Sequence, residues 1–231
     1  FSRDELKQFE MSHEFPETKY KSIRYFLGDI RDASRLQRAF QKVDIVIHAA
    51  GMNALDCSKD PLYALKFNCL ATVRFLRSAI HSGIKRFIYL STAHVYKYPL
   101  DGIIDENTCP NNIHPYAASH LAAEYALSHE IAKGRIEGVS LRISNGFGAP
   151  QDPKNNCWML LTNDLCRQAI TQGKLQLLSS GEQKRDFIPL STIVERIHRI
   201  SVKSSDGDMF KFHLVKVLFV RDSFASRTVD F

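Results

Sequence analysis

The stretch VDIVIHAAG, residues 43–51, reads as a buried strand that runs directly into three small residues. The β-branched residues of Val43–Ile47 favour a strand rather than a short helix. The small residues Ala49-Ala50-Gly51 allow a backbone to approach a flat ligand closely, and they equally allow a strand to pack closely against a helix. Both interpretations stay open on this stretch alone.

Outward from this strand, strand-like and helical patterns alternate along the chain. A long helix over 60–82 is opened by Asp60-Pro61 and closed by Gly83. Further strands are expected at Ile23–Leu27, Arg86–Leu90, Gly138–Ile143 and Leu175–Leu178, and further helices at Ser34–Gln41, Pro115–Ala132, Trp158–Gln172 and Ser191–Ile200. This alternation predicts an α/β fold, a doubly wound parallel sheet with helices on both faces. Ligands of such sheets bind beyond the carboxyl ends of the strands. We expect the segment after Asn145 to pack over those ends.

The composition excludes several classes of protein. Of 231 residues, 44% are hydrophobic and 24% charged, which is typical of an ordinary globular chain. The formal net charge is +6, but Lys and Arg alternate with Asp and Glu. We therefore expect no nucleic-acid partner, and rather an anionic small ligand such as a dinucleotide or a nucleotide diphosphate. No apolar run approaches the roughly 18–20 residues of a membrane span, so no membrane association is expected.

Cysteine usage points to a reducing compartment. The five cysteines have no CxxC or other metal-ligand spacing, so we expect no metal site. Reduced thiols in a cytoplasmic protein are the simplest interpretation.

Polar residues follow the expected strands where a ligand would lie. In LGDIRD, residues 27–32, Asp29 could accept from an adenine amino group, although a Gly-Asp turn that caps the next helix is the alternative. In RFIYLSTAHVY, residues 86–96, Ser91 and Thr92 stand at the carboxyl end of a strand. For His48, a hydrogen-bonded structural role is favoured over a ligand role.

The stretch HPYAASHLAAE, residues 114–124, places Tyr116 and His120 four residues apart, on one face of a helix. A tyrosine is a useful acid or base only where a nearby positive charge lowers its pKa, which is about 10 when unperturbed. A neighbouring hydroxyl can then stabilise the charge that develops on a substrate oxygen.

Taken together, these motifs resemble the extended short-chain dehydrogenases/reductases, in the nucleotide-sugar epimerase/dehydratase branch. The resemblance covers nearly the whole chain in the family's order: GDIRD, HAAG, Asn68 in the long helix, STAHVY, YAASH, LRISNGFGAP and RDFIPL. Each motif is weak alone, and the ordered set is specific.

The resemblance implies roles for individual residues. Tyr116 would transfer the proton, Thr92 would be its hydroxyl partner, and His120 would hold the nicotinamide ribose. The other cofactor contacts would come from Arg3, Asp29, Ile30, Ala49, Ala50, Gly51 and Asn68, with Tyr116 and His120. The nucleotide-sugar would contact His94, Asn145 and Arg185. The planar guanidinium of Arg185 is well shaped to bind a diphosphate. The cofactor would be NAD or NADP, with NADP favoured because Arg3 lies where a 2′-phosphate would sit. A homodimer would form through the helices at 60–82 and 116–132.

The sequence departs from the family pattern in three places. His120 stands where the family has lysine, and histidine is charged only below roughly pH 6.5 unless its pKa is perturbed. Ala93-His94 follows Thr92, where sugar 4,6-dehydratases place Asp-Glu, which favours epimerisation or keto reduction over dehydration. The glycine-rich GxxGxxG turn is absent from these residues.

The missing GxxGxxG turn sets an expectation about whether these residues contain the whole dinucleotide-binding fold. A GxxGxxG turn presents backbone amides to a pyrophosphate, and its strand is central in the sheet order 3-2-1-4-5-6. We therefore interpret the chain as a fragment with its first βα unit missing, which binds NAD(P)H weakly or aggregates when expressed alone. A GxxGxxG segment before Phe1 would restore the enzyme.

These observations give the working hypothesis. Residues 1–145 form a partial dinucleotide-binding Rossmann core and 146–231 a partial, interleaved substrate-binding region. The function is an NAD(P)-dependent nucleotide-sugar epimerase or keto-reductase, plausibly in surface polysaccharide synthesis. The alternatives are a Rossmann-like binding protein or gene fragment with weak or no catalysis, and a nucleotide-sugar 4,6-dehydratase.

Overall fold

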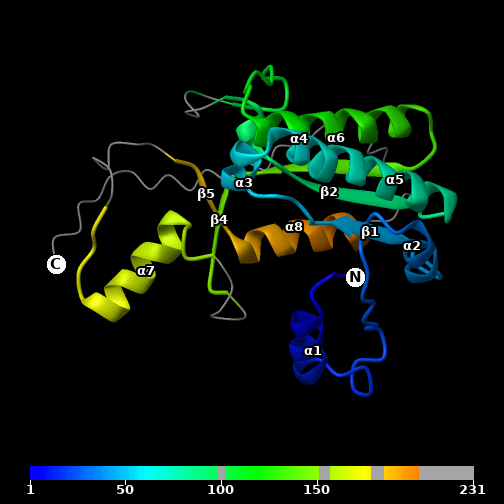
Figure 1. Ribbon diagram of the computed structural model, residues 1–231, viewed down its shortest axis with the longest axis horizontal. Coiled ribbons are helices and arrows are strands. Elements are labelled where there is room, and N and C mark those ends of the chain that lie inside the picture. The colour runs from blue at the N-terminus through cyan, green and yellow to red at the C-terminus, as the bar shows by residue number, and fades with distance from the viewer. Residues whose placement is uncertain (98–101, 103, 151–156, 178–184, 203–231) are drawn as a thin grey trace. The chain divides into compact units, whose positions relative to one another are not determined.

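The computed structural model describes residues 1–97, 102, 104–150, 157–177 and 185–202 (Figure 1). The chain divides into two compact units. The first unit comprises Phe1–Leu90 with Ile113–Ser140, and the second comprises Ser91–Asn112 with Leu141–Phe231.

The first unit contains most of the helices. They are α1 (Glu5–Glu14), α2 (Ala33–Ala39), α3 (Ala54–Lys59), α4 (Pro61–Ala64), the π-helical segment η1 (Leu65–Ala71), α5 (Thr72–His81) and α6 (Pro115–Ala132). The second unit contains the 3₁₀ turn η2 (Ala93–Val95), β4 (Asn145–Phe147), α7 (Leu161–Gln172), β5 (Phe187–Pro189) and α8 (Leu190–Val202). Strand β1 (Ile45–His48) lies in the first unit, and β2 (Arg86–Thr92) and β3 (Glu137–Ile143) run from the first unit into the second.

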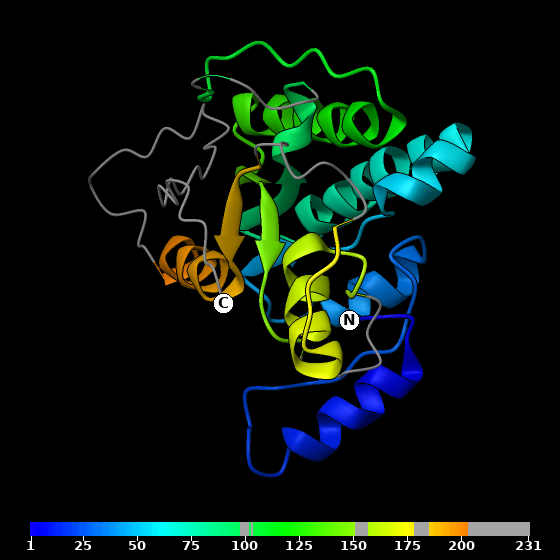
Figure 2. The same cartoon turned by 90° about the vertical axis from the view of Figure 1, so that its left-hand side faces the viewer.

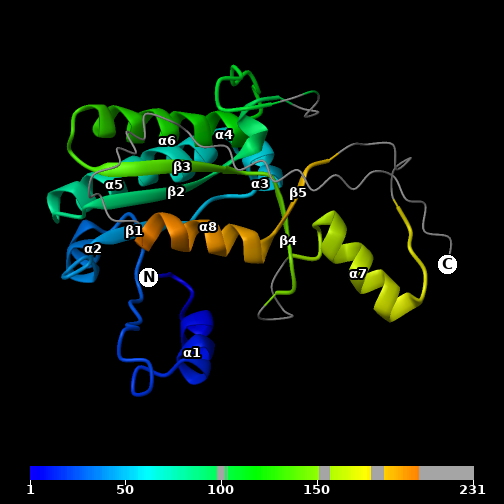
Figure 3. The ribbon, with the colours of Figure 1, turned by 180° about the vertical axis from the view of Figure 1, so that it is seen from behind.

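The main sheet has the order β1-β2-β3. Strands β1 and β2 are parallel, with Ile45 opposite Arg86 and His48 opposite Tyr89. Helices α5 and α6 run along this sheet, as Figures 1 and 3 both show. The prediction of an α/β fold with parallel strands is therefore confirmed.

The helix signals in the sequence act as expected. Asp60 accepts from the backbone N–H of Tyr63 at 2.8 Å and Pro61 takes the first helical position, so the run α4–η1–α5 begins there. It ends before Gly83, whose φ of 75° belongs to the left-handed region that glycine adopts without strain. The expected helix over 60–82 is thus one helical run with a π-helical segment inside it. Helix α6 has the bounds expected from the sequence.

The core of the first unit lies between the sheet and the helices α2, α5 and α6. Its buried cluster includes Leu36 of α2, Phe75 and Leu76 of α5, Phe87 of β2 and Leu127 of α6. Val46 and His48 of β1 are buried, whereas Ile47 between them is 49% exposed. Alternation along a strand sends successive side chains to opposite faces, so the core covers the Val46 face of β1.

Two expected strands are wrong. The segment 23–27 makes a single bridge, Ser2 with Leu27, and the backbone N–H of Tyr25 donates to the side chain of Glu17 at 3.0 Å instead of to another strand. Residues 175–177 form no strand, because the backbone N–H of Gln176 donates to the side chain of Gln168 in α7 at 2.7 Å. Leu178 lies outside the described residues. Helix α3 and strands β4 and β5 were not expected from the sequence.

Candidate functional site

The turn after β1 has exposed residues and is held by one buried side chain. Ala49, Ala50 and Gly51 are exposed. The anchor is Asn68 of η1, which is 1% exposed and accepts from the backbone N–H of Met52 at 2.7 Å. Its amide nitrogen donates to Ser119 Oγ of α6 at 3.1 Å. Asn68 therefore ties the turn to α6, and a role in cofactor binding through the turn stays a prediction.

Tyr116 and His120 lie on the first two turns of α6. His114 caps the N-terminus of the helix, and its Nδ1 accepts from the backbone N–H of Tyr116 at 3.1 Å. Pro115 follows at the first helical position. The rings of Tyr116 and His120 meet edge to face, with centroids 4.6 Å apart. The structure therefore brings together the two residues that the sequence placed on one helical face.

His120 is buried, and one of its ring nitrogens has no partner. The side chain is 5% exposed. Nδ1 lies 2.7 Å from the Tyr89 hydroxyl, whereas Nε2 has no hydrogen-bond partner in the described residues. Burial lowers the pKa of His120 to about 4, because the charged imidazolium loses its hydration. His120 is therefore a neutral hydrogen-bonding group at physiological pH, and it lacks the charge of a lysine.

The free nitrogen of His120 lies beside the turn after β1. A Cβ added to Gly51 would lie 3.6 Å from His120 Nε2 and 3.8 Å from Asn68 Oδ1. The missing side chain at Gly51 thus leaves space over an unpartnered buried donor or acceptor. This combination fits a bound group that supplies a hydroxyl at Nε2.

His48 is a structural histidine, as favoured from the sequence. It is 3% exposed, and its Nε2 lies 2.9 Å from Thr72 Oγ1. Burial, and then the nearby His120, lower its pKa to about 4. Its ring packs against Phe75 and Phe87, so His48 is part of the core beside the sheet.

Asp29 is already surrounded by donors. Its Oδ1 accepts from the backbone N–H and Nε of Arg31, both at 2.9 Å, and its Oδ2 accepts from Arg31 Nη2 at 2.6 Å and Arg3 Nη1 at 3.4 Å. The bond from Arg31 is the largest cause that lowers the Asp29 pKa to about 2. A carboxylate offers about four lone-pair sites, so an adenine amino group would have to replace one of these donors. The Arg3 contact is the longest and the easiest to replace. Ile30 beside it packs partly buried against the core.

The second unit carries Thr92 and His94. Thr92 is 3% exposed, and its hydroxyl accepts from the backbone N–H of His94 at 3.1 Å, which begins the turn η2. The carbonyl of His94 accepts from the side chain of Asn112 at 2.7 Å. The Thr92 hydroxyl is thus held by the turn that follows it.

Asn145 and Arg185 are brought together in the second unit. Strands β4 and β5 are parallel neighbours, with Asn145 opposite Phe187 (Figure 2). The side chain of Asn145 donates to the carbonyl of Asp186 at 2.8 Å, directly beside the exposed Arg185. This bond fixes the backbone from which the Arg185 guanidinium projects.

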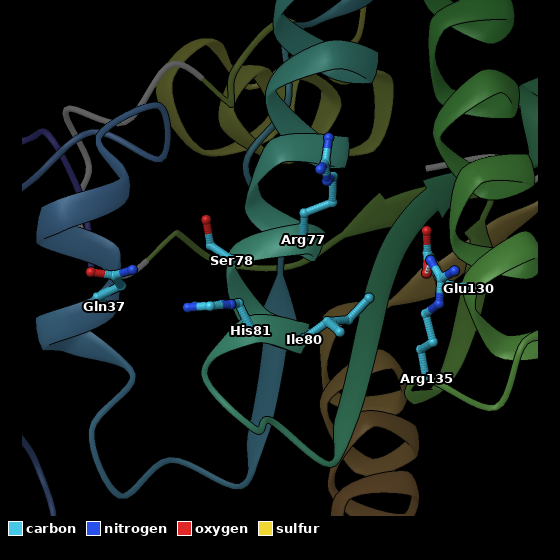
Figure 4. A pocket seen from close by; sticks show the side chains of 7 residues that line it. All are labelled: Gln37, Arg77, Ser78, Ile80, His81, Glu130 and Arg135. Atoms are coloured by element: carbon cyan, nitrogen blue, oxygen red, sulfur yellow. Dashed lines mark hydrogen bonds and ion pairs between the residues drawn. The ribbon is translucent and has the colours of Figure 1, made fainter.

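A cavity of about 380 Å³ in the first unit lies away from Tyr116. It is lined by Gln37, Arg77, His81, Glu130 and Arg135 among others (Figure 4). Glu130 follows Tyr116 by 14 residues on the same helix, which is roughly 21 Å along the axis at 1.5 Å per residue. The cavity and the Tyr116–His120 pair are therefore separate features of the first unit.

Sequence reasoning missed Tyr89 and its contact with His120. Tyr89 is 1% exposed in β2, and a buried tyrosine hydroxyl needs a hydrogen-bond partner. A tyrosine inside a continuous apolar strand was the available signal, because that hydroxyl had to meet a polar side chain of a covering helix.

Comparison with known proteins places the chain in a family. The model of the NAD dependent epimerase/dehydratase family matches residues 6–211. The chain belongs to the NAD-dependent epimerase/dehydratase family. Its members are enzymes, and the parallel α/β architecture described above is their Rossmann-type fold.

Individual relatives are nucleotide-sugar enzymes. The chain is 28% identical over 201 residues to dTDP-D-glucose 4,6-dehydratase of Mus musculus, with 84% of the chain and 54% of that protein covered. It is 36% identical over 153 residues to an inverting UDP-N-acetylglucosamine 4,6-dehydratase of Campylobacter jejuni, with 64% of the chain and 41% of that protein covered. A crystal structure of Thermus thermophilus UDP-glucose 4-epimerase in complex with NAD matches at 25% identity and a TM-score of 0.67, covering 80% of this chain and 60% of that one.

The chain spans about half the length of the curated relatives it matches. Among the described helices, none has the length and apolar character needed to cross a membrane. The described residues also contain no group of three or more His, Cys, Asp or Glu that could hold a metal ion.

Proposed function

We propose that the chain carries the hydride-transfer site of an NAD(P)-dependent nucleotide-sugar epimerase or keto-reductase. The observation that carries this proposal is the Tyr116–His120 pair on α6, with the unpartnered His120 Nε2 beside Gly51. The nucleotide-sugar relatives and the NAD-containing epimerase structure support the choice of ligands.

The proposed roles follow from this chain's residues. Tyr116 takes the proton of a sugar hydroxyl as the bond from that carbon to hydrogen breaks, and Thr92 shares the sugar oxygen. The cofactor supplies the redox chemistry, because nicotinamide accepts the hydride and can return it. His120 holds the ribose beside Ala49–Gly51, and Asp29 and Ile30 contact the adenine. Arg185 and Asn145 bind the diphosphate side of the sugar, with His94 near the sugar.

The cofactor and the assembly extend the proposal. Arg3 is 54% exposed and lies next to Asp29, so it can turn toward a 2′-phosphate, and we favour NADP for that reason. A homodimer through the helices 60–82 and 116–132 is proposed because Leu62 and Tyr125 on them are 62% and 61% exposed.

A nucleotide-sugar 4,6-dehydratase is the second candidate. It is favoured by the two relatives of that activity. Against it stands Ala93-His94 after Thr92, which offers no carboxylate to eliminate water. The product distinguishes the two, since an epimerase changes one stereocentre and a dehydratase gives a 4-keto-6-deoxy sugar.

The first test replaces the proton carrier. The protein used is this chain preceded by a GxxGxxG βα segment of the family, called the extended polypeptide below. Tyr116→Phe should abolish conversion of UDP- or dTDP-sugars, followed by NMR, and should leave the Kd for NADH within about twofold, because the ring remains. Tyr20→Phe, at an exposed tyrosine outside both proposed interface helices, is the matched control and should retain full activity. Normal turnover by Tyr116→Phe would contradict the proposed mechanism.

A further inference from the structure

Tyr89 and His120 form a buried pair that the proposed mechanism does not use. The Tyr89 hydroxyl lies 2.7 Å from His120 Nδ1, and the two rings stack with centroids 5.8 Å apart. Tyr89 also stacks on His48, with ring centroids 5.6 Å apart and an interplanar angle of 20°. His48 is opposite Tyr89 in the β1–β2 register and is itself held at Thr72. Tyr89 is therefore packed against both buried histidines.

Counting protons decides which atom of the pair donates. Burial raises the pKa of Tyr89 well above its usual value, so the phenol keeps its proton. His120 Nδ1 is the partner that the described residues offer to this hydroxyl. If Nδ1 carried the imidazole proton and donated to Tyr89, the phenolic proton would be buried without an acceptor among the described residues, which is unfavourable. Donation from Tyr89 to Nδ1 avoids this arrangement.

The direction of this bond sets what His120 offers to a ligand. A neutral imidazole whose Nδ1 accepts must carry its proton on Nε2. Among the described residues Nε2 has no hydrogen-bond partner, and it lies beside Gly51. His120 then presents an N–H there, as a lysine would, but without a charge.

We infer that Tyr89 is a positioning residue: it donates to His120 Nδ1 and so keeps the Nε2–H directed at the space beside Gly51, where it donates to a ribose hydroxyl of NAD(P). The inference rests on the proposed function for the identity of the ligand. The hydrogen-bond direction within the pair does not depend on the ligand, because it rests on the 2.7 Å contact and on the burial of both side chains.

The first measurement is the tautomer of His120, by ¹⁵N NMR of histidine-labelled extended polypeptide near pH 7. The two ring nitrogens of a neutral imidazole differ widely in shift according to which carries the proton. The expected result is Nε2–H in the unmutated protein and a loss of this preference in Tyr89→Phe. A proton on Nδ1 in the unmutated protein would overturn the inference, whether or not any variant folds.

The second measurement is a double-mutant cycle on NADH binding, because a merely structural role would affect both backgrounds equally. Tyr89→Phe should raise the Kd for NADH about five- to tenfold, the loss of one oriented hydrogen bond. In the His120→Lys background the same substitution should change the Kd by less than about twofold, because an ammonium group has no tautomer to set. Equal effects in both backgrounds would overturn the inference. If the unmutated polypeptide binds neither NADH nor NADPH, the proposed function fails, and the tautomer alone decides this inference.

Discussion

At the residue scale, two neutral histidines are buried in one stack of rings. His48 and His120 are 3% and 5% exposed, and burial lowers the pKa of each to about 4. In the unfolded chain a histidine has a pKa near 6.5. As pH falls from about 6.5 to about 4, the unfolded state therefore takes up protons that the folded state does not, and the folded state loses stability.

This difference predicts the acid sensitivity of the fold. The free energy of unfolding of the extended polypeptide, from urea titrations, should decrease by on the order of 2–3 kcal/mol per buried histidine between pH 7 and pH 4.5. His48→Gln should remove roughly half of this histidine contribution, because Gln carries no titrating group. His129→Gln, at an exposed position of α6, is the control. An identical pH dependence in His48→Gln and the control would show that the folded protein does not hold His48 as a buried, uncharged imidazole.

The same scale shows how far the sequence predicts the site. The spacing of Tyr116 and His120 predicts their common helical face, because the helical repeat depends only on local geometry. The partner of His120 was not predictable in this way, because Tyr89 is on a strand 31 residues earlier and meets His120 only through tertiary packing. The same holds for Asn68, whose four contacts join three separate segments.

At the element scale, local signals predict elements better than pairing does. The start of helix α6 is predictable from His114 and Pro115, because both residues act within the first helical turn. The π-helical segment η1 was not foreseen, because its apolar spacing differs little from that of an α-helix. The strand expected at 23–27 failed for a different reason. A strand exists only where another strand pairs with it, and here the pairing is one bridge to Ser2.

One glycine shows how closely the elements of the first unit pack. A Cβ at Gly138 of β3 would lie 2.9 Å from the carbonyl oxygen of Phe87, 3.0 Å from Leu127 and 3.1 Å from Ile131. Gly138→Ala should therefore lower the free energy of unfolding by about 1–3 kcal/mol, because a strand backbone must shift. Gly146→Ala in β4, where the nearest atom would be an ordinary 3.5 Å away, should change it by less than about 0.5 kcal/mol. Equal midpoints in urea for the two variants would contradict this packing.

At the scale of the whole molecule, the candidate residues are divided between the two units. Tyr116, His120 and Gly51 belong to the first unit, whereas Thr92 and Arg185 belong to the second. The net charge of +6 suits ligands that carry phosphates, as dinucleotides and nucleotide-sugars do. The proposal assigns roles to residues of both units, so it is tested on the extended polypeptide and not on either unit alone.

The central claim is that HPYAASH is a working site in which a neutral histidine stands at the lysine position. The direct test is the pH profile of kcat/KM for nucleotide-sugar oxidation by the extended polypeptide and its His120→Lys and His120→Ala variants. A neutral His120 cannot lower the Tyr116 pKa by its charge, so the unmutated rate should keep rising into the alkaline range, toward the ordinary tyrosine pKa of about 10. His120→Lys should move the midpoint toward neutral pH by about 1–2 units, because an ammonium group a few ångströms away stabilises the phenolate. Three superimposable profiles would contradict the account, since His120 would then act on neither the ribose nor Tyr116.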